Sequence, residues 1–304
     1  MPVKNGAWKK FNRVVILEGS YILKTINKSI YFYWGNDTIS YMRFMTLYSF
    51  KFYNPTWTIY LIKNNQDNKR ILKGTVEKQD KTEYIGKDYS YLLDTLDIII
   101  IEFDNKMIDL DDSIVSVMSD VHIKDILNWK LLSEQGGVVA DMDILFTAPI
   151  SKSITHHADI GLVCFDGNPQ KDYIPVSFMY SSGNNIFFNK IYKNALVNYK
   201  DNVYESCGTN CIYEKNLNRI SDAYPNIIIQ KLNDSIVFPF IAYPWLEGIN
   251  MLYEKDNTNL MHYESIGIHW YGGAPQSQKY NNILNDRTVH EINNTISVNI
   301  RRIL

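Results

Sequence analysis

The chain has 304 residues, of which 45% are hydrophobic, enough to bury the core of one large α/β domain. Its net charge of −2 and isoelectric point near 6.3 argue against a protein that grips nucleic-acid phosphates. The three cysteines are too few for a disulfide framework, and no secretory signal is recognisable. The longest uninterrupted apolar run, at 98–101, is far too short for a membrane span. We therefore expect a cytoplasmic protein with no integral membrane segment and no nucleic-acid partner.

Apolar, β-branched and aromatic runs recur along the chain, separated by more polar or helical stretches. Continuous runs of this kind are typical of the buried strands of a parallel sheet that helices cover on both faces. The expected strands are 29–35, 56–62, 97–103, 137–146, 159–165, 176–182 and 226–232. Because the sequence has no internal repeat and no linker, we expect residues 1–285 to form a single α/β domain with a Rossmann-like, mostly parallel sheet.

The first expected strand, "SIYFYWG", carries a tryptophan at its end. A tryptophan in this position is more often part of a hydrophobic core than a platform for a ligand. Trp34 is therefore a candidate binding residue only if neighbouring motifs support that function.

The segment "SDVHIKDILNWKLLSEQGG" predicts a helix that begins after Ser119 or Asp120. Its apolar residues recur at helical spacing, and they are Ile123, Ile126, Leu127, Leu131 and Leu132. Gly136 and Gly137 then provide the left-handed conformation that ends a helix. This unit leads directly into the run at 137–146.

Two carboxylates, Asp141 and Asp143, interrupt that apolar run. Residues i and i+2 of an extended segment point the same way, and two neighbouring carboxylates repel each other unless a cation lies between them. Mn²⁺ or Mg²⁺ suits such oxygen ligands, with diphosphate oxygens completing its shell. The carboxyl end of a strand in an open α/β sheet is also where ligands bind. An isolated D-x-D pair is more often a polar loop, so the surrounding residues must decide.

A later stretch, "YESIGIHWYGGAPQSQKY", contains two further candidates. His269 is either a ligand of a metal or pyrophosphate, or a histidine buried at a strand end with one hydrogen bond. The glycines that follow offer backbone amides, and Lys279 offers a positive charge, to a diphosphate.

Residues 286–304 carry a stripe of apolar side chains at three- and four-residue spacing, namely Val289, Ile292, Ile296 and Ile300. This spacing predicts a C-terminal amphipathic helix, which we expect to pack on the domain. A membrane-surface helix is the alternative. It is disfavoured because the polar face has acids and asparagines in place of a lysine-rich surface.

The block "KDILNWKLLSEQGGVVADMD" resembles the sugar-binding region of DXD-motif glycosyltransferases. That family includes yeast-type initiating mannosyltransferases, capsular-polysaccharide transferases and, more distantly, large clostridial toxins. Its pattern is roughly [AS]-D-x-x-R-[YF]-x-x-L-x-x-x-G-G-x-Y-x-D-x-D. The resemblance implies a GT-A fold, assigns Asp125 to hydroxyl groups of the donor, and assigns Asp141 and Asp143 to the metal and the donor.

Two departures from this pattern matter. Asn128 stands where the family usually has arginine, and Trp129 where it usually has tyrosine. Asparagine can hydrogen-bond a donor hydroxyl, but it brings no charge. We expect Asn128 to contact the donor in this weaker way.

Two outer patches support the resemblance by their order and spacing. Residues 29–62 are similar to the family's opening strand, helix and second strand, which implies that Trp34 stacks on the nucleotide base. His269-Trp270 matches part of a motif near the end of the family's catalytic domain, which implies that His269 binds the metal or the donor. Lys279 is the expected further donor contact.

The resemblance implies a metal-dependent glycosyltransferase with Asp141 and Asp143 as its catalytic residues. It would move a hexose or N-acetylhexosamine from a nucleoside-diphosphate sugar, UDP preferred over GDP, to a glycan, lipid or protein acceptor with retention of configuration. One alternative is a degenerate sugar- or nucleotide-binding module, which Asn128 favours. A D-x-D phosphatase is the other, disfavoured because Leu145 stands where that motif has threonine or valine.

Overall fold

The computed structural model describes residues 25–35, 38–64, 84–155, 157–165, 173–213 and 217–304. Within these ranges the strands are β1 (Ser29–Trp34), β2 (Thr58–Lys63), β3 (Ile99–Glu102), β4 (Gly137–Ala140), β5 (Ile144–Phe146), β6 (Ile160–Cys164), β7 (Phe178–Ser181), β8 (Ile229–Asn233) and β9 (Gly267–His269). The helices are α1 (Tyr41–Tyr53), α2 (Asp112–Val115), α3 (Asp120–Glu134), α4 (Ile186–Asn198), α5 (Leu217–Ala223), α6 (Trp245–Tyr253), α7 (Pro275–Ile283), α8 (Thr288–Glu291) and α9 (Thr295–Arg301).

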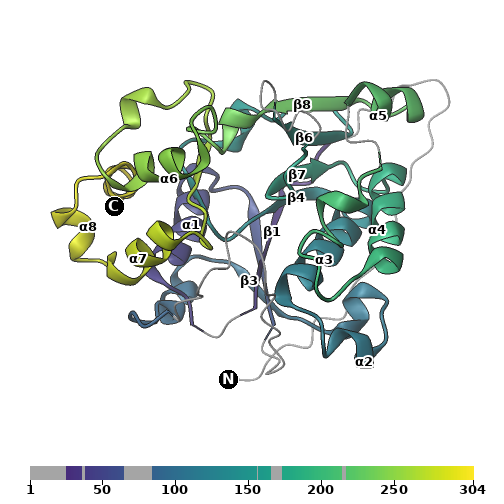
Figure 1. Ribbon diagram of the computed structural model, residues 1–304, viewed down its shortest axis with the longest axis horizontal. Coiled ribbons are helices and arrows are strands. Elements are labelled where there is room, and N and C mark those ends of the chain that lie inside the picture. The colour runs from purple at the N-terminus through teal and green to yellow at the C-terminus, as the bar shows by residue number, and fades with distance from the viewer. Residues whose placement is uncertain (1–24, 36–37, 65–83, 156, 166–172, 214–216) are drawn as a thin grey trace.

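In the described part of the chain, seven strands form one sheet in the order β3-β2-β1-β4-β7-β6-β8 (Figure 1). Neighbours pair in parallel except at β7, which runs antiparallel to both β4 and β6. The expected α/β fold with a mostly parallel sheet is confirmed. The strand order reverses between β1 and β4, and ligands of open α/β sheets bind beyond the carboxyl ends of the strands at such a point.

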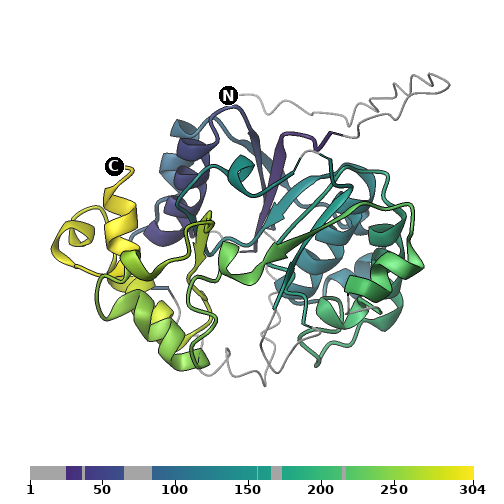
Figure 2. The same cartoon turned by 90° about the horizontal axis from the view of Figure 1, so that it is seen from above.

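Helices cover both faces of the sheet (Figures 1 and 2). α3 and α4 lie on one face, while α1 lies on the other, with the C-terminal helices beyond it. Successive side chains of a strand point to opposite faces, so β1 contributes to both cores. Ile30 and Phe32 belong to the core on the α1 side, and Tyr31 and Tyr33 belong to the core on the α3 side.

α3 begins and ends as the sequence predicts. Ser119 is the residue that caps it, because its side chain accepts a hydrogen bond from the N–H of His122. Gly136 and Gly137 follow the helix with φ values of 69° and 95°. A Cβ atom on Gly137 would lie 2.6 Å from a backbone oxygen of β1, so glycine also allows β4 to approach β1 closely.

The apolar run at 137–146, predicted as one strand, is two strands in different sheets. β4 ends at Ala140, the chain turns at Met142, and β5 pairs antiparallel with β9 in a separate two-stranded sheet. Both acids therefore lie in the connection between β4 and β5, and a turn rather than an extended segment brings them together. The β5–β9 pairing also carries the late segment around His269 to this connection.

The C-terminal segment 286–304 also differs from the expected single helix. It forms two short helices, α8 and α9, because the side chain of Asn294 caps α9 by accepting a hydrogen bond from the N–H of Ser297 at 2.8 Å. Val289, Ile296 and Ile300 are nevertheless buried in the core on the α1 side. None of the described helices is both long enough and apolar enough to cross a bilayer.

Ile296→Val tests whether this tail is part of the core. Ile296 is completely buried, so removing one methylene group should lower the free energy of unfolding by about 1 kcal/mol. Ile186 is 68% exposed, and Ile186→Val should change that free energy by less than about 0.5 kcal/mol. Urea unfolding measures both. Equal effects at the two positions would show that the tail does not contribute to the core.

Candidate metal centre and active site

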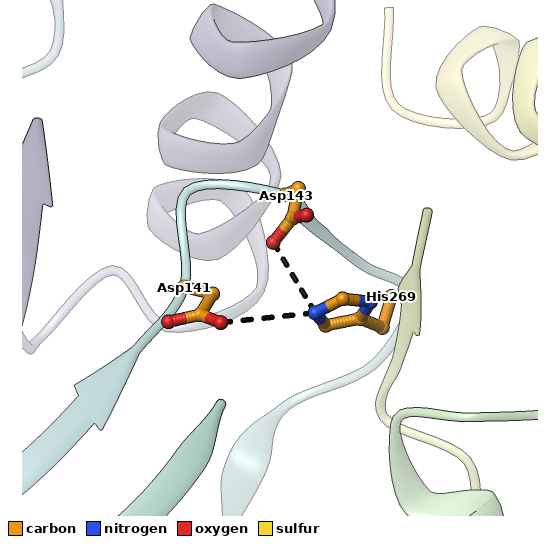
Figure 3. A group of neighbouring side chains, drawn as sticks. All are labelled: Asp141, Asp143 and His269. Atoms are coloured by element: carbon orange, nitrogen blue, oxygen red, sulfur yellow. Dashed lines mark ion pairs between the residues drawn. The ribbon is translucent and has the colours of Figure 1, made fainter. Parts of the chain in front are cut away.

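Three side chains from distant parts of the chain converge beside the carboxyl end of β4 (Figure 3). Asp141 and Asp143 come from the connection between β4 and β5, and His269 comes from β9, where it pairs with Ile144. The Nε2 atom of His269 lies 3.3 Å from Asp143 Oδ1 and 3.8 Å from Asp141 Oδ2. One possible ligand atom from each residue lies within 4.8 Å of the other two. The structure thus brings together the three residues predicted as metal ligands.

The remaining oxygen of each carboxylate is held by another group of the protein. Lys124 Nζ donates to Asp141 Oδ1 at 2.8 Å, and the backbone N–H of Gly272 donates to Asp143 Oδ2 at 2.7 Å. Each aspartate therefore has one oxygen fixed by a hydrogen bond and the other facing His269. Outer hydrogen bonds of this kind orient the ligands of metal sites.

These donor atoms fit a hard divalent cation. Carboxylate oxygens with one imidazole nitrogen suit Mn²⁺ or Mg²⁺ better than a softer metal. The backbone N–H of Tyr271 donates to Nδ1 of His269 at 3.3 Å, so in the neutral ring the proton is on Nε2 and faces the carboxylates. A cation bound at Nε2 would displace this proton.

Lys124, which the sequence did not single out, forms ion pairs with both Asp141 and Asp125. Burial by itself would lower the pKa of Lys124, but the Asp141 and Asp125 carboxylates outweigh it and raise this pKa well above its usual value. Burial by itself would likewise raise the pKa of Asp141, but the charges of Lys124 and His269 reverse the shift. Lys124 and Asp141 are therefore both charged at neutral pH.

Arg43 of α1 is a second cation that sequence reasoning missed. Its guanidinium carbon lies 3.8 Å from the centre of the Trp34 ring and 5.1 Å from that of Trp270. Its Nη1 donates to the carbonyl oxygen of Met142, between the two acids, at 3.4 Å. Burial lowers the pKa of Arg43 to about 10, against the opposing effect of Asp143, so the guanidinium stays charged at neutral pH.

Trp34, the predicted base platform, ends β1 and is partly buried. Its Nε1 donates to the carbonyl oxygen of Thr38 at 3.0 Å, which fixes the plane of the ring. The guanidinium of Arg43 covers one face of this ring. A nucleotide base would therefore have to stack on the opposite face.

Asp125 and Asn128 lie one turn apart on α3, and both are buried. Burial raises the pKa of Asp125 to about 7, and the partly compensating charge is that of Lys124. A Cβ atom on Gly208 would lie 2.6 Å from Asp125 Oδ2, so the glycine allows the segment 203–211 to approach the carboxyl group closely.

Lys279, the predicted further donor contact, lies on the exposed side of α7. Its ammonium is 5.7 Å from the centre of the Tyr280 ring. The amide that contacts the acids in this region is that of Gly272, in the glycine pair from which backbone donors were expected. A donor-binding role for Lys279 stays a prediction.

No protein-family model matches the sequence, and no curated protein matches it. Similar solved structures include the PaToxG glycosyltransferase, at 16% identity and a TM-score of 0.48 over 91% of this chain and 86% of that chain. The apo form of the glycosyltransferase GlyE from Streptococcus pneumoniae TIGR4 has 9% identity and a TM-score of 0.44 over 91% and 62% of the two chains. The galactosyltransferase LgtC, in complex with donor and acceptor sugar analogues, has 10% identity and a TM-score of 0.40 over 87% and 100%. At these scores the likeness assigns neither an activity nor a substrate to this chain.

Proposed function

We propose that the protein is a metal-dependent glycosyltransferase of the GT-A type. It would move a hexose or N-acetylhexosamine, with retention, from a nucleoside-diphosphate sugar to a glycan, lipid or protein acceptor. The observation that carries the proposal is the convergence of Asp141, Asp143 and His269 at the point where the strand order reverses. The motif resemblance supports it further, because Asp125 lies on α3 and Lys124 of the same helix pairs with Asp141.

Each side chain of the proposed site has its own part in binding the donor. Asp141 and Asp143 would hold Mn²⁺ or Mg²⁺ through the oxygens that face His269, and the bound ion supplies a Lewis acid that stabilises the departing nucleoside diphosphate. Trp34 is proposed to stack on the base through the ring face opposite Arg43, with UDP preferred over GDP. Asp125 is proposed to hydrogen-bond a hydroxyl group of the ribose or the sugar, which it can do both as donor and as acceptor near its pKa of about 7.

A panel of UDP- and GDP-sugars, incubated with the protein and Mn²⁺, tests this proposal. A transferase should release nucleotide from one donor slowly even without an acceptor, and EDTA should stop the release. A phosphatase would instead cleave p-nitrophenyl phosphate, and a degenerate binding module would bind nucleotide without releasing it from a sugar. Either result would replace the proposed function.

Trp34→Ala should weaken binding of the donor nucleotide by about 1–3 kcal/mol, the range measured for stacking of bases on aromatic side chains. The change also removes the ring on which Arg43 rests, so some loss of thermal stability is expected. Trp34→Phe keeps a stacking face and should recover much of the affinity. Calorimetric titration with UDP and Mn²⁺ measures both variants. A lower melting temperature with unchanged nucleotide affinity would show that Trp34 is only a core residue.

A further inference from the structure

Lys124 is a largely buried cation that joins the two parts of the proposed donor site. Its Nζ atom lies 2.8 Å from Asp141 Oδ1 and 3.5 Å from Asp125 Oδ1. Asp141 belongs to the proposed metal centre, and Asp125 to the proposed hydroxyl-binding position, so one ammonium group contacts both. Its side chain is only 19% exposed, and charges interact more strongly where water is largely excluded.

The surrounding residues of α3 make this charge distinctive. Asn128, one turn further along the same helix face, is buried and uncharged, although the motif resembled here has arginine at that position. Lys130, the other lysine of α3, pairs with Asp109 at 2.7 Å. Lys124 is therefore the lysine of α3 that is directed at the proposed donor site.

Two cations lie beside the two acids. Lys124 pairs with Asp141, and Arg43 donates to the carbonyl oxygen of Met142 between the acids, so together with a divalent ion they would supply positive charge for the diphosphate of a nucleotide sugar. We propose that Lys124 is a positioning residue that fixes Asp141 and supplies positive charge for binding the nucleoside diphosphate. The inference rests on the proposed function and extends it to Lys124, which stands where the motif resembled here has alanine or serine.

The role predicts different effects on the affinities for the two ligands of the site. Lys124 attracts a diphosphate, so its loss weakens nucleotide binding. It repels a divalent ion while it orients Asp141, so its loss removes a repulsion together with a hydrogen bond. A purely structural lysine would not separate the two affinities in this way.

The test measures Lys124→Met in two titrations. Electron paramagnetic resonance gives the dissociation constant of Mn²⁺ alone, and calorimetry gives those of UDP and GDP at saturating Mn²⁺. We expect the nucleotide dissociation constant to rise by about 10- to 100-fold, the size of effect of losing one interaction with a charged group. The Mn²⁺ constant should not rise, because the lost repulsion offsets the lost hydrogen bond to Asp141. Lys124→Arg keeps the charge and should recover most of the affinity. Lys124→Gln is uncharged but can still donate to Asp141, and it should show the same loss if Lys124→Met does not fold.

Lys130→Met is the matched control, because Lys130 is a similarly buried, ion-paired lysine of the same helix with 14% exposure. It should leave nucleotide affinity unchanged. Three outcomes would overturn this inference while leaving the proposed function intact. They are unchanged nucleotide affinity in both Lys124→Met and Lys124→Gln, an equal loss of nucleotide affinity in Lys130→Met, and a loss of Mn²⁺ affinity that parallels the loss of nucleotide affinity. A wild-type protein that binds neither nucleotide would overturn both.

Discussion

Asp143→Asn is expected to lower Mn²⁺-dependent release of nucleotide from the donor by about 1,000-fold, since a metal ion contributes several kcal/mol and each 1.36 kcal/mol is tenfold in rate. The amide oxygen can still accept the hydrogen bond from Gly272, so the turn should keep its shape. With its oxygen held by Gly272, the asparagine would present its amide NH2, which cannot bind a cation, to His269 in place of the carboxylate oxygen. Mn²⁺ affinity measured by electron paramagnetic resonance should fall together with the rate.

The fold should survive this substitution. Asparagine has nearly the same volume as aspartate, and the change removes repulsion between the carboxylates of residues 141 and 143. Asp109→Asn is a suitable control, because Asp109 pairs with Lys130 away from the three converging residues and should leave the rate unchanged. Undiminished turnover in Asp143→Asn, or turnover that EDTA does not affect, would refute the metal assignment.

The central strands of the sheet, β1, β4, β6 and β7, could be predicted because they are buried on both faces. Such strands form continuous apolar runs, and the runs at 29–35 and 159–165 correspond to β1 and β6 within a residue at each end. α3 was predictable for a different reason, since its cap and its glycine stop are local signals.

The division of the run at 137–146 could not be predicted from local pattern. Both halves are apolar and buried, and what separates them is that β4 pairs within the main sheet whereas β5 pairs with β9, far along the chain. The break before α9 is different, because the asparagine that caps it was visible in the sequence. The apolar spacing continues across this cap, so the spacing alone predicts one helix.

The cations of the site were missed for a physical reason. Lysine and arginine are common and mostly exposed, so a sequence does not show which of them is buried against an acid. Arg43 approaches the acids through the packing of α1 against β5, and Lys124 through the packing of α3 beside β4. In contrast, the acids themselves stood out because two carboxylates at the end of an apolar strand have no role in packing.

Trp129→Ala should lower the free energy of unfolding by about 3–5 kcal/mol, the usual cost of truncating a buried aromatic residue. Trp129 is fully buried, and its ring stacks on Phe188 with centroids 6.0 Å apart. Its Nε1 also donates to the carbonyl oxygen of Cys207 at 2.7 Å. This bond fastens the segment 203–211 to α3, and Gly208 of that segment lies against Asp125. Trp129 thus supports the proposed donor site without being placed in it.

Trp129→Phe separates the two contributions of this residue. Phenylalanine keeps most of the buried ring but leaves the Cys207 carbonyl without the indole donor, which should cost about 1–3 kcal/mol. Trp245→Ala is the control, because Trp245 is 37% exposed and its truncation should cost less than that of Trp129. Urea unfolding of the three variants measures these costs. If Trp129→Phe were as stable as the wild type, the hydrogen bond to Cys207 would not hold the segment 203–211 against Asp125. Packing of the ring alone would then account for the effect of Trp129→Ala.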